Sequence, residues 1–284
     1  MAGGNALSEK VLKESNDITA SRTKGLCPLS VVIIAHNEER NIARCIESVQ
    51  SLADEVILLD SGSTDNTVAI SKSLGAKVHH HPFDDYADQK NRAAALAQNE
   101  LVLSLDADEA LSESLKQSLE QVLKGEGPIL ACSMNRLTNY CGTWVKNGGW
   151  YPDTKLRIYP KSRGRWKGVF VHEELEVDTD IPRKQLRGDL LHYSFYSIGQ
   201  HMQTVNNFSE RKARKDFQKG KRFSYLKLIF AAPVKFISIY LLRMAWRDGW
   251  AGYHIARISA FGAYLHQAKL GELERQKKRR PDKV

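Results

Sequence analysis

The sequence predicts an α/β protein with a mostly parallel sheet flanked by helices, followed by a helical extension. Short apolar runs alternate with helical segments four times between residues 29 and 124. The runs are apolar at consecutive positions, which is typical of strands buried on both faces. Regular alternation of strand and helix favours right-handed crossovers and a doubly wound sheet. Beyond residue 198 the pattern becomes helical and basic.

The expected elements follow the chain in a simple order. Strands are predicted at residues 29–35, 55–60, 77–80 and 101–105, and helices at 37–49, after the turn 61–67, at 86–98 and at 112–124. In the turn, Thr64 or Asp65 is a candidate cap for the helix that follows. Four β segments are expected in the aromatic and Gly-rich part, at residues 132–137, 156–159, 169–176 and 188–193, before helices over 198–270.

Composition supports a domain with a large core and two different flanking segments. Hydrophobic residues make up 42% of the 284 residues, which argues against global disorder. Residues 1–27 are polar and without a clear period, so we expect a mostly disordered leader. We place the α/β domain at residues 28–197 and a basic helical extension at residues 198–284.

The four cysteines indicate reduced thiols in the cytoplasm. None is spaced as CxxC, and no stretch near the start resembles the apolar core of a secretory signal. Disulfides are rare in reducing compartments, and zinc sites need clustered ligands. We therefore expect neither a disulfide framework nor a zinc site.

The positive charge is concentrated in the C-terminal part. The net charge is +9, but residues 201–284 alone hold 19 basic and 6 acidic side chains. The remainder of the chain is therefore slightly acidic. Such an asymmetry indicates an anionic partner surface, either a membrane or nucleic acid.

Two carboxylates follow the fourth predicted strand directly. Asp106 and Asp108 stand one residue apart and point the same way along an extended chain. In open α/β sheets, ligands bind outside the carboxyl ends of the strands. Such a pair can hold a hard divalent cation that also binds phosphate oxygens. The alternative is an acidic N-cap for the next helix.

Asp60 ends the second predicted strand, next to a Ser-Gly turn. An acidic group in this place suits recognition of a ribose hydroxyl or a base, and the alternative is a cap for the turn alone. The first strand is not followed by GxGxxG, and GxxxxGK[ST] is absent from the chain. The sequence therefore argues against a dinucleotide-dependent dehydrogenase and a P-loop enzyme.

Three strings together resemble the family 2 glycosyltransferases of the GT-A fold, which is Rossmann-like. They are residues 30–39 (SVVIIAHNEE), 56–67 (VILLDSGSTDNT) and 103–109 (LSLDADE). The resemblance covers about residues 28–195. It implies a nucleotide-sugar donor and inversion at the anomeric carbon. One departure is Ser61, where many members carry a second Asp.

The resemblance also implies roles for individual residues. Asp60 would hold the nucleoside, most simply uridine, and Asp106 would lie near the ribose or the metal. Asp108 would coordinate Mg²⁺ or Mn²⁺ bridging the diphosphate. The full donor site is expected to comprise Ala35, His36, Asn37, Glu38, Asp60, Ser61, Asp106 and Ala107.

An inverting transfer needs a base for the acceptor hydroxyl, an effect worth roughly 10²–10⁴-fold in rate. Glu173 is the first candidate, with Glu174 and His172 behind it. The alternative is a solvated acidic strand face. His192 is a candidate third metal ligand or diphosphate contact, although lone histidines are more often structural.

Aromatic and charged side chains in residues 150–157 could bind the acceptor. Aromatic faces stack on sugar rings, and Asp or Arg can bind hydroxyls or phosphates. The candidates are Trp150, Tyr151, Asp153 and Arg157. Ordinary packing between the sheet and a loop is the alternative.

Within the family, three further strings resemble bacterial glycosyltransferases of the lipopolysaccharide inner core. They are residues 150–153 (WYPD), 171–173 (VHE) and 188–193 (GDLLHY). This resemblance implies transfer of a hexose, most simply glucose from UDP-glucose, to heptose of a lipid-linked oligosaccharide. Another cell-envelope polysaccharide is the alternative acceptor.

The basic extension predicts a location at the cytoplasmic face of the inner membrane. In residues 223–250 aromatic side chains are interleaved with cations, and uncharged runs do not exceed seven residues. This composition is typical of a helix lying against anionic lipid rather than one spanning a bilayer. Packing of the helix on the catalytic domain is the alternative. A nucleic-acid-binding protein, or a nucleotidyltransferase on the same fold, explains the strand-end carboxylates less well, so no nucleic-acid partner is expected.

Overall fold

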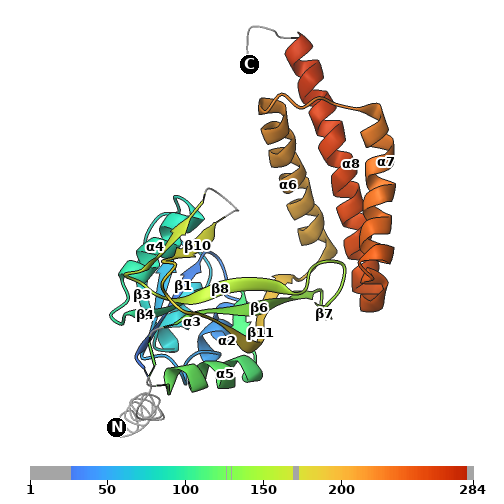
Figure 1. The fold of residues 1–284 in the computed structure, drawn as a ribbon. Helices are drawn as coiled ribbons and strands as arrows, with labels where there is room; N and C mark the ends of the chain where they lie inside the picture. Colours follow the sequence, from blue (N-terminus) through green and yellow to red (C-terminus); the bar gives the residue numbers. More distant parts are fainter. Residues whose placement is uncertain (1–26, 126, 129, 169–172, 280–284) are drawn as a thin grey trace, which may run out of the picture. The chain divides into compact units, whose positions relative to one another are not determined.

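The computed structural model describes residues 27–125, 127–128, 130–168 and 173–279. The main sheet has the strand order β3-β2-β1-β4-β8-β6-β11-β5, with β7 paired to β6 (Figure 1). Strands β1 (Leu29–Ala35), β2 (Glu55–Asp60), β3 (Lys77–His80) and β4 (Leu101–Asp106) are mutually parallel. The α/β class and its parallel half are confirmed. The expected leader, residues 1–27, lies almost wholly outside the described residues.

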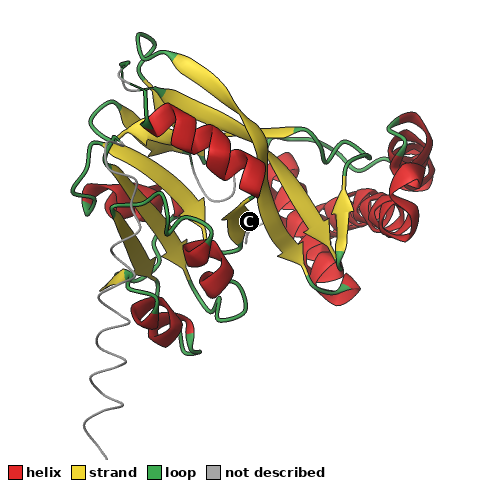
Figure 2. Cartoon of the chain, turned by 90° about the horizontal axis from the view of Figure 1, so that it is seen from below, coloured by secondary structure: helices red, strands yellow, loops and turns green. Residues whose placement is uncertain are grey.

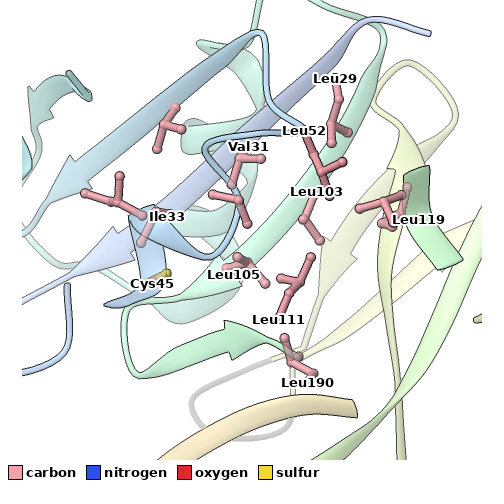
Figure 3. Close-up of a cluster of buried hydrophobic side chains, with 14 of the residues drawn as sticks. Leu29, Val31, Ile33, Cys45, Leu52, Leu103, Leu105, Leu111, Leu119 and Leu190 are labelled. Atoms are coloured by element: carbon pink, nitrogen blue, oxygen red, sulfur yellow. The ribbon is translucent and has the colours of Figure 1, made fainter. Parts of the chain in front are cut away.

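Strand β1 is buried on both faces, and this explains its unbroken apolar sequence. Leu29, Val31 and Ile33 belong to one hydrophobic cluster (Figure 3). Val32, between them, belongs to a second cluster on the other face of the sheet. Because side chains alternate along a strand, each face supplies its own core. The parallel strands therefore lie in the middle layer of the fold.

Helices cover both faces of the parallel strands (Figure 2). They are α2 (Ile42–Glu47), α3 (Thr67–Ser73), α4 (Tyr86–Ala95) and α5 (Glu113–Leu123). The first is shorter than expected, because residues 37–41 form a loop whose Asn37 has a positive φ of 57°. The N-cap of α3 is Asn66 rather than Thr64 or Asp65, and Asp65 accepts a hydrogen bond from the Thr67 amide at 3.0 Å from one residue before the cap.

The later β segments are longer and more numerous than the sequence indicated. They are β5 (Glu109–Leu111), β6 (Ala131–Tyr140), β7 (Thr143–Val145), β8 (Asp153–Pro160), β9 (Gly164–Lys167), β10 (Glu174–Val177) and β11 (Arg183–Phe195). Strand β8 pairs antiparallel with β4, and β9 pairs antiparallel with β10. Of the expected strand 169–176, residues 169–172 lie outside the described residues.

The chain forms two compact units. The first comprises the residues up to Met134 together with Thr154–Leu190, and the second comprises Asn135–Asp153 and the residues from Leu191 onward. Strands β6 and β11 contribute residues to both units. The expected boundary at residue 197 remains a prediction from the sequence.

The second unit is built on three long helices. They are α6 (Ile198–Gln218), α7 (Tyr225–Ile237) and α8 (Gly249–Arg279), with a π turn η2 (Ser238–Leu242) and a 3₁₀ turn η3 (Ala245–Asp248) before α8. Helix α8 packs against both α6 and α7 (Figure 1). Phe223, just before α7, lies beside Gly271 in the later part of α8. Phe236, near the end of α7, contacts Tyr253 near the start of α8, so the two helices run antiparallel.

Candidate functional site

The carboxyl ends of three neighbouring strands bring the predicted donor residues together. In the sheet register Ala35 of β1 pairs with Asp60 of β2, and Ile34 of β1 pairs with Asp106 of β4. The two aspartates therefore flank the end of β1 from opposite sides. This is the edge at which open parallel sheets bind ligands. The helix-cap alternative for Asp106 and Asp108 is excluded, because Ser112 caps α5 instead.

Asp60 is buried and held by the turn that follows it. Its Oδ2 accepts hydrogen bonds from the amides of Gly62 at 2.9 Å and Ser63 at 3.0 Å. Gly62 has a φ of 92°, a conformation that glycine adopts without the strain of a Cβ. Burial raises the pKa of Asp60, but the hydrogen bonds from Ser63 and Gly62 outweigh it and hold the pKa below its usual value. The carboxylate thus caps its turn and stays ionised.

The loop after β1 is tied to the loop after β2. The Asn37 amide donates to Ser63 Oγ at 2.9 Å, and Asn37 Oδ1 accepts from the Thr64 amide at 2.8 Å. The Glu38 amide donates to Thr67 Oγ1 at 2.8 Å. His36 and Asn37 are exposed. These bonds fix the backbone beside Asp60 while leaving the His36 ring accessible.

Ser61 is also positioned from a distant helix. Its amide donates to the Ala35 carbonyl at 2.9 Å, and its hydroxyl accepts from Gln89 Nε2 of α4 at 2.8 Å. The same Gln89 nitrogen donates to the His81 carbonyl at 3.1 Å. The hydroxyl of Ser61 is therefore used to join strand β2 to helix α4.

Asp106 is surrounded by buried cations. Arg157 Nη2 of β8 lies 2.8 Å from Asp106 Oδ2 and 2.7 Å from Glu109 Oε1. Glu109 is fully buried, and its other oxygen accepts from the Asp106 amide at 3.1 Å. Burial lowers the pKa of Arg157, but Glu109 and Asp106 outweigh it and raise that pKa above its usual value. Arg157 therefore stays charged and holds Asp106 in place.

The other oxygen of Asp106 meets a lysine from α4. Lys90 Nζ lies 2.9 Å from Asp106 Oδ1 and 3.2 Å from Glu173 Oε1, and the Lys90 side chain is only 1% exposed. Its ammonium also lies 4.5 Å from the Trp166 ring centroid, a cation–π contact. Lys90 thus links the candidate base Glu173 to the carboxylate at the end of β4.

The carboxylates around β1 and β4 crowd together, as a cation site requires. Burial raises the pKa of Glu38, and the neighbouring Asp108, Asp65 and Asp106 raise it further, against a hydrogen bond from Asn41. Among the described residues, no group of three or more His, Cys, Asp or Glu side chains is arranged to hold a metal. Mg²⁺ commonly takes one or two carboxylates and completes its shell with substrate phosphates. A cation at this edge would need further ligands from a substrate, and its binding remains a prediction.

Asp106 and Asp108 are both half-buried, and both oxygens of Asp106 are paired with buried cations. Ala107 between them is buried. Direct metal contact by Asp108 remains a prediction from the resemblance. A role of Asp106 as a metal ligand remains a prediction.

The residues predicted for acceptor binding are not all surface groups. Arg157 is buried and paired as described above, so it is not placed to bind an acceptor at the surface. Trp150 packs edge-on against Tyr140, with ring centroids 6.0 Å apart, in an aromatic cluster of the second unit. Asp153 accepts from Arg136 Nη2 at 2.7 Å, also within that unit. The packing alternative therefore describes Trp150 well, and the acceptor roles of Tyr151 and Asp153 remain predictions.

The remaining candidates have separate locations. His172 lies outside the described residues. Glu174 is exposed at the start of β10, opposite Lys167 of β9. His192 belongs to the second unit, where its Nδ1 lies 2.8 Å from Ser194 Oγ. Their predicted roles are untested by the geometry, and Glu173 is the base candidate that the structure joins to Asp106.

The sequence patterns did not point to Lys90, Glu109 or Gln89. Lys90 follows Ala87 by three residues and precedes Ala94 by four, so it shares the buried face of α4. A lysine on an otherwise small, apolar helix face is a signal that could have identified it. Glu109 had no such signal, because its burial depends on Arg157 from a strand 48 residues later.

An α/β sheet with carboxylates at the ends of β2 and β4, on either side of β1, matches the expected GT-A fold of glycosyltransferases. The model of the glycosyl transferase family 2 matches residues 30–174. An uncharacterised glycosyltransferase of Rickettsia typhi is 34% identical over 255 residues, covering 86% of this chain and 87% of that protein. The chain therefore belongs to glycosyl transferase family 2.

Two further proteins to which the chain is similar have names that state a more specific function. The lipopolysaccharide core biosynthesis glycosyltransferase LpsC of Rhizobium meliloti is 30% identical over 249 residues, covering 86% of this chain and 92% of that protein. Among solved structures, glucosyl-3-phosphoglycerate synthase from Mycobacterium tuberculosis, in complex with Mn²⁺, UDP and glucosyl-3-phosphoglycerate, matches with 28% identity and a TM-score of 0.33. That match covers 44% of this chain and 48% of the synthase. Family membership makes the chain an enzyme, so the nucleic-acid-binding alternative is not retained.

Proposed function

We propose that this glycosyltransferase transfers a hexose, with inversion, from a UDP-hexose to heptose of a lipid-linked lipopolysaccharide core. The observation that supports it best is the alignment of Asp60 and Asp106 on either side of the end of β1. Similarity to LpsC, named for lipopolysaccharide core biosynthesis, supports the acceptor class. UDP-glucose is the donor we favour, and another cell-envelope polysaccharide is the alternative product.

The donor would lie across the ends of β2, β1 and β4. Asp60 and the loop of Ala35, His36 and Asn37 would contact the nucleoside, because their backbone is fixed by the bonds between the two loops. Asp108 would hold Mg²⁺ or Mn²⁺ together with the diphosphate oxygens. When bound, the cation supplies positive charge that stabilises the leaving UDP.

The proposed transfer is a single displacement. The acceptor oxygen forms a bond to the anomeric carbon while the bond from that carbon to the diphosphate breaks, and the acceptor proton passes to Glu173. Lys90, within 3.2 Å of Glu173 Oε1, would hold that carboxylate in place. Arg157 and Lys90 together would keep Asp106 fixed at the end of β4. Preorganised charges of this kind lower the barrier without reorganisation during the reaction.

A panel assay tests the proposal directly. The full chain would be incubated with UDP-glucose, UDP-galactose and UDP-N-acetylglucosamine, with a heptose-containing core acceptor, with and without Mn²⁺. We expect transfer from one UDP-hexose that stops on chelation and in Asp108→Asn. Transfer unaffected by chelation would refute the metal role, and transfer only to an acceptor without heptose would refute the acceptor.

Glu173→Gln examines the base separately. This change removes a proton acceptor but keeps the size of the side chain, so turnover is expected to fall by roughly 10²–10⁴-fold. UDP binding in the presence of Mn²⁺, measured by calorimetry, should persist. Glu174→Gln is the matched control, because Glu174 is the next residue and is exposed at the start of β10, and it should retain most activity if Glu173 is the base.

A further inference from the structure

Helix α7 carries an extensive row of exposed apolar side chains. Leu226 is 70% exposed and Ile229 is 61% exposed, and no residue of α7 is buried. We define the apolar face of α7 as Leu226, Ile229, Phe230, Val234, Ile237 and, in η2, Leu241. Contiguous exposed apolar surfaces are rare on proteins that meet only water and mark an interaction site.

These side chains share one side of the helix, and the cations lie off it. They recur at intervals of three or four residues, which an α-helix places on a single face. Lys235 follows Leu226 by nine residues and therefore lies on about the opposite side. Lys227 stands at the border of the face. The face is thus free of charge, although the sequence around it is interleaved with lysines.

The neighbouring segments supply the groups that favour a membrane–water boundary. Trp246 is 52% exposed in η3, and Trp250 is 54% exposed at the start of α8. Arg243 and Arg247 lie beside them in the sequence. Tryptophan is enriched at the level of lipid headgroups, and arginine attracts anionic lipid. The excess of basic residues in 201–284 adds the same preference for an anionic surface.

We propose that the apolar face of α7 inserts into the headgroup–acyl boundary of an anionic bilayer, with α7 lying in the plane of the membrane. The proposal rests on the proposed function in one respect, since a lipid-linked acceptor would be met at that surface. It assigns lipid contact to α7 itself, rather than to the basic residues near the end of the chain.

Insertion in the plane fits the packing better than spanning does. By length and composition alone, Tyr225–Leu242 is the one segment of the described chain that could cross a membrane, whereas the sequence favoured a helix lying on the surface. However, Arg257 of α8 lies 5.9 Å from the Phe236 ring of α7. A spanning α7 would bring this packed arginine toward the hydrocarbon, at a cost of several kcal/mol. A helix in the boundary keeps Arg257 on the aqueous side.

A second copy of the chain is a less suitable occupant. Two apolar faces brought together would also bring together two strongly basic C-terminal regions, whose like charges repel. An anionic lipid surface instead matches both the apolar face and the charge around it. The amphipathic arrangement, apolar on one side with Lys227 at its border and Lys235 on about the opposite side, is that of a helix bound at a bilayer interface.

Vesicle co-sedimentation of the full-length chain tests this proposal with a matched pair of variants. Phe230 of α7 is 56% exposed and Phe208 of α6 is 49% exposed, so each can be changed to Glu without disturbing a core. With vesicles of phosphatidylethanolamine and phosphatidylglycerol, Phe230→Glu is expected to weaken binding by about tenfold or more, because one apolar insertion is lost. Phe208→Glu introduces the same charge and should change binding by less than about twofold.

Three outcomes would overturn the proposal. These are unchanged binding of Phe230→Glu, equal weakening by both variants, or a wild-type dimer in light scattering that Phe230→Glu dissociates without affecting vesicle binding. UDP binding with Mn²⁺ by calorimetry is measured in parallel. If Phe230→Glu still binds UDP, its weaker vesicle binding reflects a lost lipid contact and not a damaged donor site. If the wild type does not bind UDP, the proposed function is refuted and the lipid proposal is not.

Discussion

The first unit and helix α7 use apolar residues in opposite ways. Leu103 of β4 is completely buried among other side chains of the sheet, whereas Leu226 of α7 is 70% exposed. Charged side chains show the opposite pattern of exposure. Lys90 and Arg157 are buried between carboxylates in the first unit, while Lys227 and Lys235 of α7 are exposed.

This difference indicates two environments for one chain. Buried charges are stable only when paired, so Lys90 and Arg157 depend on the carboxylates around them, and we attribute this cluster to the proposed donor site. Exposed apolar side chains in a row are favourable only when water is removed from them, which we attribute to lipid at α7. The following predictions test this contrast, from the largest expected effect to the smallest.

Breaking the buried pair should have the largest effect on stability. Arg157→Met leaves Glu109 buried without its counter-ion, which typically costs about 3–5 kcal/mol of unfolding free energy. Urea denaturation followed by circular dichroism measures this loss. Adding Glu109→Leu should recover part of it, because the unpaired charge is removed. If the double variant were less stable than Arg157→Met, charge burial would be the wrong explanation.

Deletion of one leucine side chain should separate the two environments. Leu103→Ala creates a cavity in a closed core and is expected to cost about 2–5 kcal/mol. Leu226→Ala removes a side chain already in contact with solvent, so its effect should stay within about 0.5 kcal/mol. The same denaturation experiment in detergent-free buffer compares them. A large loss in Leu226→Ala would mean that α7 is covered in solution.

His201 should make the second unit sensitive to acid. Burial of this residue lowers its pKa from 6.5 to about 4, and Tyr140 Oη lies 2.9 Å from its Nδ1. Between pH 6.5 and 4 the unfolded chain therefore binds a proton that the folded chain does not. The neutral His201 ring makes its full contribution to the free energy of unfolding above pH 6.5. This contribution falls as the pH drops toward 4, by about 3 kcal/mol at most. His201→Gln, denatured across this range, should flatten that part of the profile, and an unchanged slope would assign it to other groups.

Lys90 should affect turnover more than stability. Lys90→Met keeps the packing of α4 but releases Glu173 and Asp106 from their shared cation, so we expect kcat to fall roughly ten- to hundredfold. Lys90→Arg should restore part of the loss, since a guanidinium also bridges two carboxylates. Steady-state kinetics for both variants separates kcat from KM. An effect of Lys90→Met on the donor KM alone would make Lys90 a donor-binding group rather than a positioning residue.

The sequence by itself determined the parallel half of the sheet and the position of its carboxylates. Strands buried on both faces have unbroken apolar runs, and a residue directly after such a run must lie at the strand end. Asp60 and Asp106 were therefore placed from local pattern alone, and the register shows that they lie on either side of the end of β1.

Only the tertiary structure decided which groups surround these carboxylates and which face of α7 is exposed. Arg157 reaches Asp106 from a position 51 residues later, and Lys90 reaches Glu173 across 83 residues. Such pairs depend on how the strands and helices pack, which local periodicity does not encode. For α7, periodicity identifies an apolar side, but whether that side meets α8 or the surroundings depends on packing. The structure turns it outward, because α8 contacts the opposite side.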